Sequence, residues 1–203
     1  EDLRWAVPNI LTKEITVAYR QSGHLHELAR KLVALTGGNP SDAILPDYAE
    51  NEGVPPVLMT QISNPSTIAN WLGERVTEIE SSLGELPSIA VLVNTEDEVR
   101  SVAENLQGAL ADKNISVIPC PDGQVRGRDG AVRVFNVQHI KGLEFEAVFF
   151  VGVDRLAADQ PDLFDKYLYV GTTRAATYLG LTCETELPGS MASLKPLFGD
   201  RWA

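Results

Sequence analysis

Three short groups of residues combine side chains that could bind a nucleotide. In Tyr19-Arg20, an aromatic ring beside a permanent cation could stack on a base while the guanidinium contacts a phosphate. Residues 141–144 offer the ammonium of Lys141, a glycine that permits a close backbone approach or a positive φ, and the carboxylate of Glu144 as an acceptor for a sugar hydroxyl. The third group ends in Arg174, whose guanidinium is suited to bidentate phosphate contact.

Each group also has a purely structural interpretation. Arg20 can be a surface cation beside a half-buried Tyr19, and Lys141 can form an exposed ion pair with Glu144 that is worth little. Arg174 closes a predicted helix and can bind its last carbonyl groups as a C-terminal cation. Residue types alone leave both alternatives open for every group.

The apolar pattern predicts the elements that must position these groups. Continuous apolar runs predict strands at residues 14–18, 57–63, 89–93, 115–118, 132–137, 147–151 and 178–183. Apolar residues at helical spacing predict helices near residues 25–35, 68–83, 99–110 and 161–175. Thr95 is a candidate N-cap, with Glu98 as its capping-box partner. Such alternation indicates an α/β domain with a mostly parallel sheet and helices on both faces.

Ligands of an open parallel sheet bind at the carboxyl ends of its strands. Polar groups just past strand ends are therefore candidates for a binding site, and this rule places the three groups above at the carboxyl edge of the sheet. Their shared location would bring residues that are far apart in the sequence into one site.

Composition limits the possible classes of protein. The chain has 203 residues, of which 44% are hydrophobic and 22% charged, as expected for one globular domain with short appendages. The net charge of −11 argues against nucleic-acid binding through a broad basic surface, although a local basic groove remains compatible with it. No apolar run approaches the length of a membrane span, so we expect no membrane contact.

Cysteines and histidines indicate neither a disulfide nor a metal site. Cys120 and Cys183 lie in or beside apolar segments, which predicts two buried free thiols and a reducing, cytoplasmic environment. The three histidines, His24, His26 and His139, lack partners at metal-ligand spacing.

Taken together, the three groups resemble motifs of the second RecA-like domain of superfamily 1 helicases of the UvrD/Rep type. The matching order is Tyr-Arg after an early strand, Lys-Gly-Leu-Glu-Phe before a buried strand, and Tyr-Val-Gly-Thr-Thr-Arg-Ala before the final strand. The resemblance covers residues 14–184. It implies that residues 1–13 are an interdomain linker or the end of a preceding domain, and that residues 185–203 are a C-terminal tail.

In that family, ATP lies in a cleft between two RecA-like domains. The resemblance implies that Tyr19 stacks on adenine and that Glu144 contacts the ribose. It implies that Arg20 and Arg174 reach the γ-phosphate as catalytic arginines, and that Gly142 lies close to the phosphates or to nucleic acid.

The resemblance also implies contacts with single-stranded DNA. The family presents a Thr and a His just before the Lys-Gly pair, whereas this chain has Asn136 and Gln138 there, with His139 one place later. Amide side chains can still bind phosphate. We assign Asn136, Gln138, His139, Lys141 and Thr172 to the nucleic-acid side.

Parts of a complete motor are missing from the sequence. It contains no G-x-x-x-x-G-K-[ST] loop and no apolar strand ending in Asp-Glu. The resemblance therefore implies an N-terminal P-loop domain as partner, which would hold ATP and Mg²⁺. We expect the chain alone not to hydrolyse ATP. Residues 120–130 also leave no space for the large inserted domain of UvrD and Rep.

Three functions remain as alternatives. The first is the motor domain of a DNA helicase or translocase, and the second is the same domain of a HelD-type ATPase that remodels RNA polymerase. The acidic charge and the ending of the last motif favour the second. The third is a degenerate module kept for binding, which the presence of Tyr19, Arg20, Glu144 and Arg174 disfavours.

Overall fold

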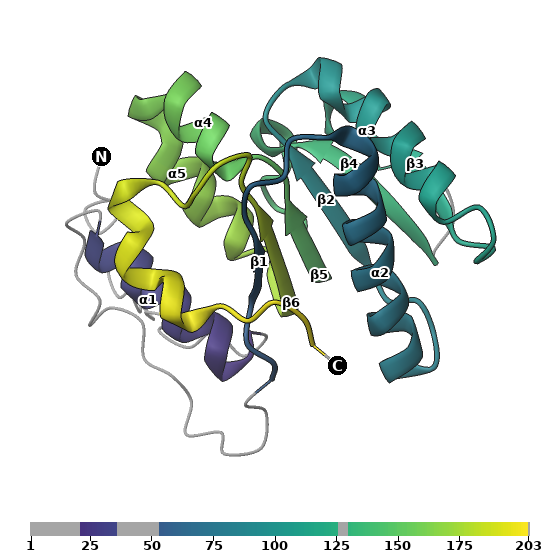
Figure 1. Ribbon diagram of the computed structural model, residues 1–203, viewed down its shortest axis with the longest axis horizontal. Helices are drawn as coiled ribbons and strands as arrows, with labels where there is room; N and C mark the ends of the chain where they lie inside the picture. Colours follow the sequence, from purple (N-terminus) through teal and green to yellow (C-terminus); the bar gives the residue numbers. More distant parts are fainter. Residues whose placement is uncertain (1–20, 36–52, 126–129, 203) are drawn as a thin grey trace, which may run out of the picture.

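A single parallel sheet forms the centre of the domain. The computed structural model describes residues 21–35, 53–125 and 130–202. Within them, six strands pair in the order β1-β6-β5-β2-β4-β3, and every pair is parallel (Figure 1). The strands are β1 (Val57–Met59), β2 (Ile89–Val93), β3 (Ser116–Pro119), β4 (Ala131–Asn136), β5 (Phe145–Phe150) and β6 (Ala175–Thr182). The predicted parallel α/β architecture is confirmed, whereas the predicted strand 14–18 lies outside the described residues.

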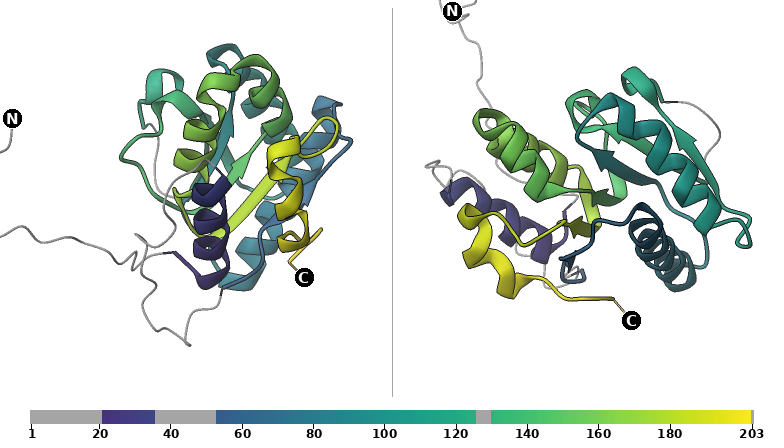
Figure 2. Two further views of the ribbon diagram at one scale, coloured as in Figure 1. Left: turned by 90° about the vertical axis from the view of Figure 1, so that its left-hand side faces the viewer. Right: turned by 45° about the horizontal axis from the view of Figure 1, so that its top comes forward.

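Helices cover both faces of the sheet, as predicted. On one face lie α2 (Pro65–Leu83) and α3 (Glu96–Ala109). The other face is covered by α1 (Gly23–Leu35), α4 (Val153–Asp159), α5 (Pro161–Thr172) and the 3₁₀ segment η5 (Gly189–Leu197) (Figure 2). Two hydrophobic clusters therefore fill the domain, one on each side of the sheet.

Local sequence explains where several elements begin and end. All five residues of β2 are buried, because β2 lies inside the sheet and helices cover both of its faces. Helix α2 begins after Asn64, whose side chain accepts hydrogen bonds from two N–H groups of the first turn, and ends at Gly84 with φ 77°. The predicted capping box is confirmed on its Glu98 side, where the carboxylate accepts from the N–H groups of Asn94 and Thr95 at 3.0 and 3.1 Å.

Other boundaries differ from the prediction. The predicted strand 57–63 ends at Met59, where pairing with β6 ends. The short helix α4 was not predicted, and α5 ends at Thr172, so that Arg174 follows the helix. The strand predicted at 147–151 begins earlier, at Phe145.

The connection between β4 and β5 crosses the sheet without an α-helix. These strands follow each other in the sequence, but β2 lies between them in the sheet. Residues 137–144 bridge them, beginning with the 3₁₀ turn η4 (Val137–His139). Ile140 is fully buried in the cluster that also contains the core residues of α5. This connection carries half of the residues predicted for function, namely Gln138, His139, Lys141, Gly142 and Glu144.

The C-terminal segment packs onto the domain. Leu187, Met191 and Leu194 are buried in the cluster on the α5 side of the sheet. Gly199 forms a parallel bridge with Val57 beside β1. The ring of Trp202 lies 5.1 Å from that of Tyr178, centroid to centroid. Residues beyond 184 thus contribute to the same core, and their assignment as a separate tail stays a prediction.

Candidate functional site

Two of the three predicted groups meet at the amino edge of the sheet, the edge at which its strands begin. Residues 141–144 lead into β5, and Arg174 leads into β6. These strands are parallel neighbours, and their first residues, Phe145 and Ala175, are partners in the register. The rule that placed these groups just past strand ends is therefore wrong for both, because both precede a strand.

Arg174 joins the two groups. Its Nε donates to the carbonyl of Val170 in the last turn of α5, at 3.3 Å, and its Nη1 donates to the carbonyl of Leu143, at 3.4 Å. The backbone N–H of Phe145 in turn donates to the Arg174 carbonyl, at 3.0 Å. Arg174 therefore binds a carbonyl group at the end of α5, as its structural interpretation predicted. Its side chain also contacts residues 141–144, through the carbonyl of Leu143.

The charge of Arg174 is not neutralised by a carboxylate within residues 21–35, 53–125 and 130–202. Arg75 and Arg155 differ, since each forms ion pairs with glutamates. The two N–H groups on Nη2 of Arg174 also make no hydrogen bond to the described residues, whereas Nε and Nη1 do. A half-buried guanidinium with free donors is suited to an anion.

Gln21 and Ser22, the first residues that the structure describes, lie beside the start of β6. Gln21 Nε2 lies 3.2 Å from the carbonyl oxygen of Ala175 and 3.5 Å from that of Thr172. The N–H of Ser22 donates to the carbonyl of Ala176, at 2.8 Å. Tyr19 and Arg20 lie outside the described residues, so their predicted roles stay predictions.

Gly142 has the backbone conformation that the sequence allowed for. Its φ is 84°, and a Cβ built on it would meet no atom within 4 Å. The residue therefore provides a left-handed conformation, and space is not the constraint. The N–H of Leu143 donates to the carbonyl of Ile140, at 3.1 Å, and closes the turn. Lys141 and Glu144 are both exposed beside it.

Three residues assigned to nucleic acid lie at the opposite, carboxyl edge of the sheet. Asn136 pairs with Val93, the last residue of β2. Asn136 is buried, and its Oδ1 accepts from the N–H of Gln138, at 3.0 Å. Exposed His139 lies 3.8 Å from a carboxylate oxygen of Glu96 at the start of α3. The structure therefore separates these residues from Arg174.

Thr172 has a local partner as well. It is 3% exposed, and its hydroxyl donates to the carbonyl of Leu168, at 2.8 Å. Like Asn136, it serves the local structure in this conformation, and its nucleic-acid role stays a prediction.

An ion-pair network at the carboxyl edge was missed by sequence reasoning. Arg155 in α4 pairs with Glu98 of α3 and, at 2.9 Å, with Glu184 just past β6. The neighbouring Asp154 accepts hydrogen bonds from the N–H groups of Glu184 and Thr185, at 2.9 and 2.8 Å. Asp154 and Arg155 lie in the first turn of α4, just after the end of β5, so the strand-end rule could have found them.

These contacts predict a pH-dependent contribution to stability. Partial burial acts to raise the pKa of Asp154, but the hydrogen bonds from Thr185 and Glu184 outweigh it and lower that pKa below its usual value. The contribution is therefore present above the pKa of an unfolded Asp, about 4, and is lost as the pH falls through the lower folded pKa. Asp154→Asn should lower the free energy of unfolding by about 1 kcal/mol at pH 7.

Urea unfolding followed by circular dichroism at several pH values tests this prediction. The difference between Asp154→Asn and the unsubstituted chain should shrink as the pH falls below about 4. Asp159→Asn, at the exposed end of the same helix, is the matched control and should change little. A difference that stays constant with pH would contradict the role of the carboxylate charge.

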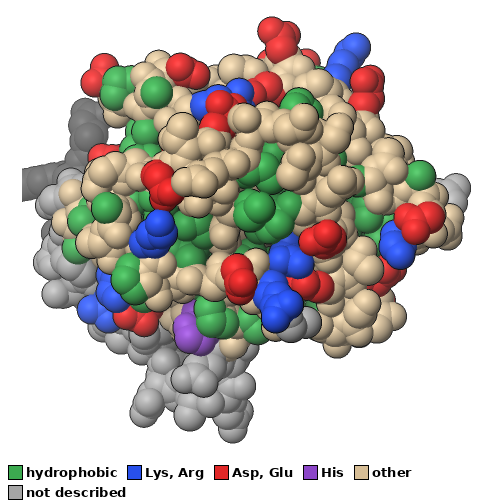
Figure 3. Space-filling view, in the orientation of Figure 1, with side chains coloured by type: hydrophobic (Ala, Val, Ile, Leu, Met, Phe, Trp, Pro, Cys, Tyr) green, Lys and Arg blue, Asp and Glu red, His purple; other side chains and the backbone are tan. Residues whose placement is uncertain are grey.

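The surface agrees with the acidic composition. On the face shown in Figure 3, Lys and Arg side chains lie interspersed with Asp and Glu, and no broad basic patch forms among the described residues.

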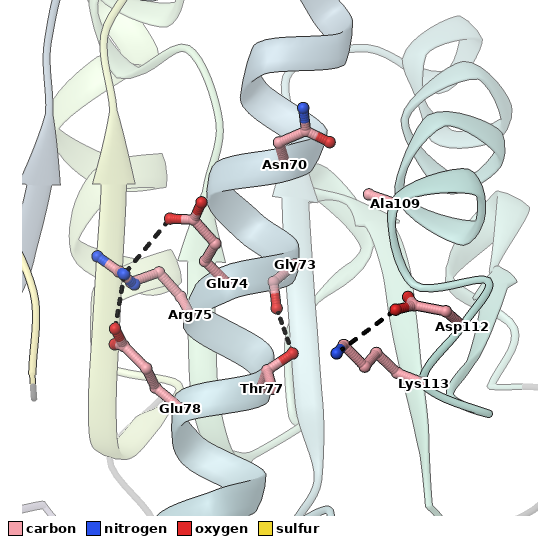
Figure 4. Close-up of a pocket in the computed structure, with 9 residues that line it drawn as sticks. All are labelled: Asn70, Gly73, Glu74, Arg75, Thr77, Glu78, Ala109, Asp112 and Lys113. Carbon is pink, nitrogen blue, oxygen red and sulfur yellow. Dashed lines mark hydrogen bonds and ion pairs between the residues drawn. The ribbon is translucent and has the colours of Figure 1, made fainter.

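A cavity of about 570 Å³ lies between α2 and the end of α3 (Figure 4). Its charged groups pair with one another, as in Arg75 with Glu78 at 2.6 Å. None of the predicted site residues lines it.

Neither a metal cluster nor a membrane helix occurs in the described ranges. No three or more His, Cys, Asp or Glu side chains there are arranged to hold a metal ion. None of the helices described is long and apolar enough to cross a membrane. Cys120 and Cys183 are buried and free, as predicted.

Comparison with known proteins agrees with this geometry. The family model of the UvrD-like helicase C-terminal domain matches residues 131–182, which include residues 141–144 and Arg174. The C-terminal domain of a possible DNA helicase from Lactobacillus plantarum WCFS1 has a TM-score of 0.58 and 16% identity, over 86% of this chain and 93% of that one. A hypothetical ATP-dependent RNA helicase from Sulfolobus tokodaii has a TM-score of 0.50 and 16% identity, over 98% of this chain and 55% of that one. No curated protein matches the sequence.

The fold and the matches define the class of domain. It is a RecA-like α/β domain with an all-parallel sheet among the described residues. The chain resembles the C-terminal domain of UvrD-like helicases, which confirms the resemblance predicted from the motifs. At 16% identity the structural similarity shows the fold alone, and the HelD-type alternative stays a prediction.

Proposed function

We propose that this chain is the second motor domain of an ATP-dependent superfamily 1 helicase or translocase. ATP would be bound by a P-loop domain elsewhere in the same protein, and Arg174 would contact its γ-phosphate. The observation that carries the proposal is the guanidinium of Arg174, which is half-buried, held by two carbonyl groups and not paired with a carboxylate among the described residues. The planar guanidinium fork matches the geometry of a phosphate group and can bind it with two hydrogen bonds.

The other proposed contacts follow the resemblance. Glu144 would accept from the ribose, and Gly142 would allow the loop to approach the phosphates. Their location supports this, because Leu143 and Phe145, which flank Glu144, both contact Arg174. Tyr19 and Arg20 would complete the site as the base-stacking ring and the second catalytic arginine. Mg²⁺ would be held by the P-loop domain and would neutralise phosphate charge there.

We propose single-stranded DNA as the nucleic-acid partner. Gln138, His139 and Lys141 are exposed and could contact a phosphate backbone, and buried Asn136 would support Gln138. Thr172 is buried at the amino edge, and its proposed role follows the resemblance alone. The acidic composition keeps the second proposal open, a HelD-type motor that acts on RNA polymerase.

ATPase assays on a protein that contains this chain and a P-loop domain separate the two proposals. Stimulation by single-stranded DNA is expected for a helicase or translocase. Stimulation by RNA polymerase, without any effect of DNA, would favour the HelD-type alternative. The isolated chain should bind ATP weakly, and sub-micromolar binding measured by calorimetry would contradict the proposal that it is half of a site.

A further inference from the structure

We infer that Gln21 is a positioning residue for Arg174. Its side-chain amide binds the backbone on both sides of the α5–β6 turn (Thr173-Arg174) and holds the guanidinium in place. This inference rests on the proposed function, since it matters for catalysis only if Arg174 contacts the nucleotide.

The hydrogen bonds at the end of α5 show what Gln21 adds. The last carbonyl groups of a helix lack partners within the helix. The Val170 carbonyl accepts from Arg174 Nε at 3.3 Å, and the Gly171 carbonyl accepts from the Arg174 N–H at 3.2 Å. The next carbonyl, that of Thr172, accepts from Gln21, which also reaches the carbonyl of Ala175. Among the described residues, no other side chain from outside α5 and β6 binds the backbone of residues 172–175.

The chemistry of glutamine suits this position. Its amide has two N–H donors, so one side chain can serve two carbonyl groups without placing a charge beside the guanidinium. A glutamate could not donate, and a lysine would repel Arg174.

Helix α1 and its packing fix the backbone beside Gln21. Ser22, the next residue, donates its N–H to Ala176 at 2.8 Å and accepts from the N–H of His26 at 3.0 Å. Leu25 and Leu28 then bury α1 against the α5 side of the sheet. The amide is thus fixed by packed structure, which a positioning residue requires.

Gln21→Met tests the inference, because methionine has a similar length and no N–H donor. In a protein that contains this chain and a P-loop domain, kcat should fall roughly tenfold while KM for ATP changes little, since small misplacements of a catalytic group are costly. In an Arg174→Ala background, Gln21→Met should cause no further loss, as expected for two residues that act through one contact. Gln61→Met, which removes an exposed donor to Glu186, is the matched control.

Amide hydrogen exchange on this chain provides a second measurement that does not depend on activity. Gln21→Met should speed exchange at the N–H groups of Thr173 and Arg174, and Gln61→Met should not. Unchanged exchange together with unchanged kcat would overturn the inference, even if Arg174→Ala abolishes turnover. If Arg174→Ala has no effect on turnover, the proposed function fails instead, and the exchange result still decides whether Gln21 holds the turn.

Discussion

Arg174→Ala is expected to lower kcat for ATP hydrolysis by roughly 10³-fold in a protein that contains this chain and a P-loop domain. This corresponds to a rise of about 4 kcal/mol in the activation free energy. The reason is that a guanidinium contributes most when negative charge spreads over the transferred phosphoryl group. KM for ATP should change far less, since the P-loop domain would supply most of the binding in the ground state.

Arg174→Lys separates charge from geometry. Lysine keeps the positive charge but lacks the planar fork, and it cannot bind the carbonyls of Val170 and Leu143 while presenting two donors to a phosphate. We expect a loss of roughly 10²-fold, intermediate between alanine and the natural residue.

A stability control is needed because Arg174 also closes a helix. Loss of its hydrogen bond to Val170 should lower the free energy of unfolding by only about 1 kcal/mol. Arg100→Ala, on the exposed side of α3, is the matched control for removal of an arginine and should leave turnover unchanged. Turnover within tenfold of the natural protein for Arg174→Ala, with the fold intact by circular dichroism, would show that Arg174 is a helix-end residue only.

Local pattern was enough to predict elements whose burial and ends depend on adjacent residues. Strand β2 was predicted with its observed bounds, because an unbroken apolar run suits a strand covered on both faces. The end of α2 at Gly84 and the role of Glu98 at the start of α3 are also set by a few neighbouring residues. In these places a few neighbouring residues determine the local structure, so the sequence alone predicts it.

Long-range pairing was not predictable in the same way. Nothing near β4 or β5 indicates that β2 lies between them, since that order depends on residues far away in the chain. For the same reason, the strand-end rule assigned residues 141–144 and Arg174 to the wrong edge of the sheet. The contact between Arg174 and Leu143 exists because Phe145 and Ala175 are register partners, which no local pattern encodes.

The residues proposed to bind the nucleotide and those proposed to bind nucleic acid lie at different edges of the sheet. The proposed nucleotide contacts, Glu144 and Arg174, lie at the amino edge, whereas Gln138 and His139 lie at the carboxyl edge. Residues 137–144 join the two edges as one short connection. A change at one end of this connection could thus reach the other through few covalent links, as coupling between ATP and nucleic acid would require.

Gly180→Ala is expected to be strongly destabilising, because β6 has no space for a side chain there. Gly180 pairs with Val57 on one side and Phe149 on the other. A Cβ built on Gly180 would lie 2.6 Å from Cδ1 of Phe149 and 3.1 Å from Cη2 of Trp71. The rings of Phe149 and Trp71 pack edge to face, with centroids 6.1 Å apart, so neither can move without disturbing the core. Overpacking of this kind costs about 1–3 kcal/mol.

Gly108→Ala provides the matched control. Gly108 lies near the end of α3, and a Cβ there would meet no atom within 4 Å. Alanine should therefore raise the free energy of unfolding by about 0.5–1 kcal/mol, through helix propensity alone. Urea unfolding monitored by circular dichroism measures both variants, and tryptophan fluorescence reports on the packing around Trp71 and Trp202.

The pair of variants also tests how β6 supports the proposed site. Arg174 immediately precedes β6, so a shift of this strand to relieve Phe149 would move the guanidinium away from Leu143. Gly180→Ala should therefore lower kcat as well as stability, whereas Gly108→Ala should leave kcat unchanged. If Gly180→Ala proves as stable as the natural chain, this result would contradict the close packing of α2 against β6 at Gly180. It would also contradict the proposal that β6 positions Arg174.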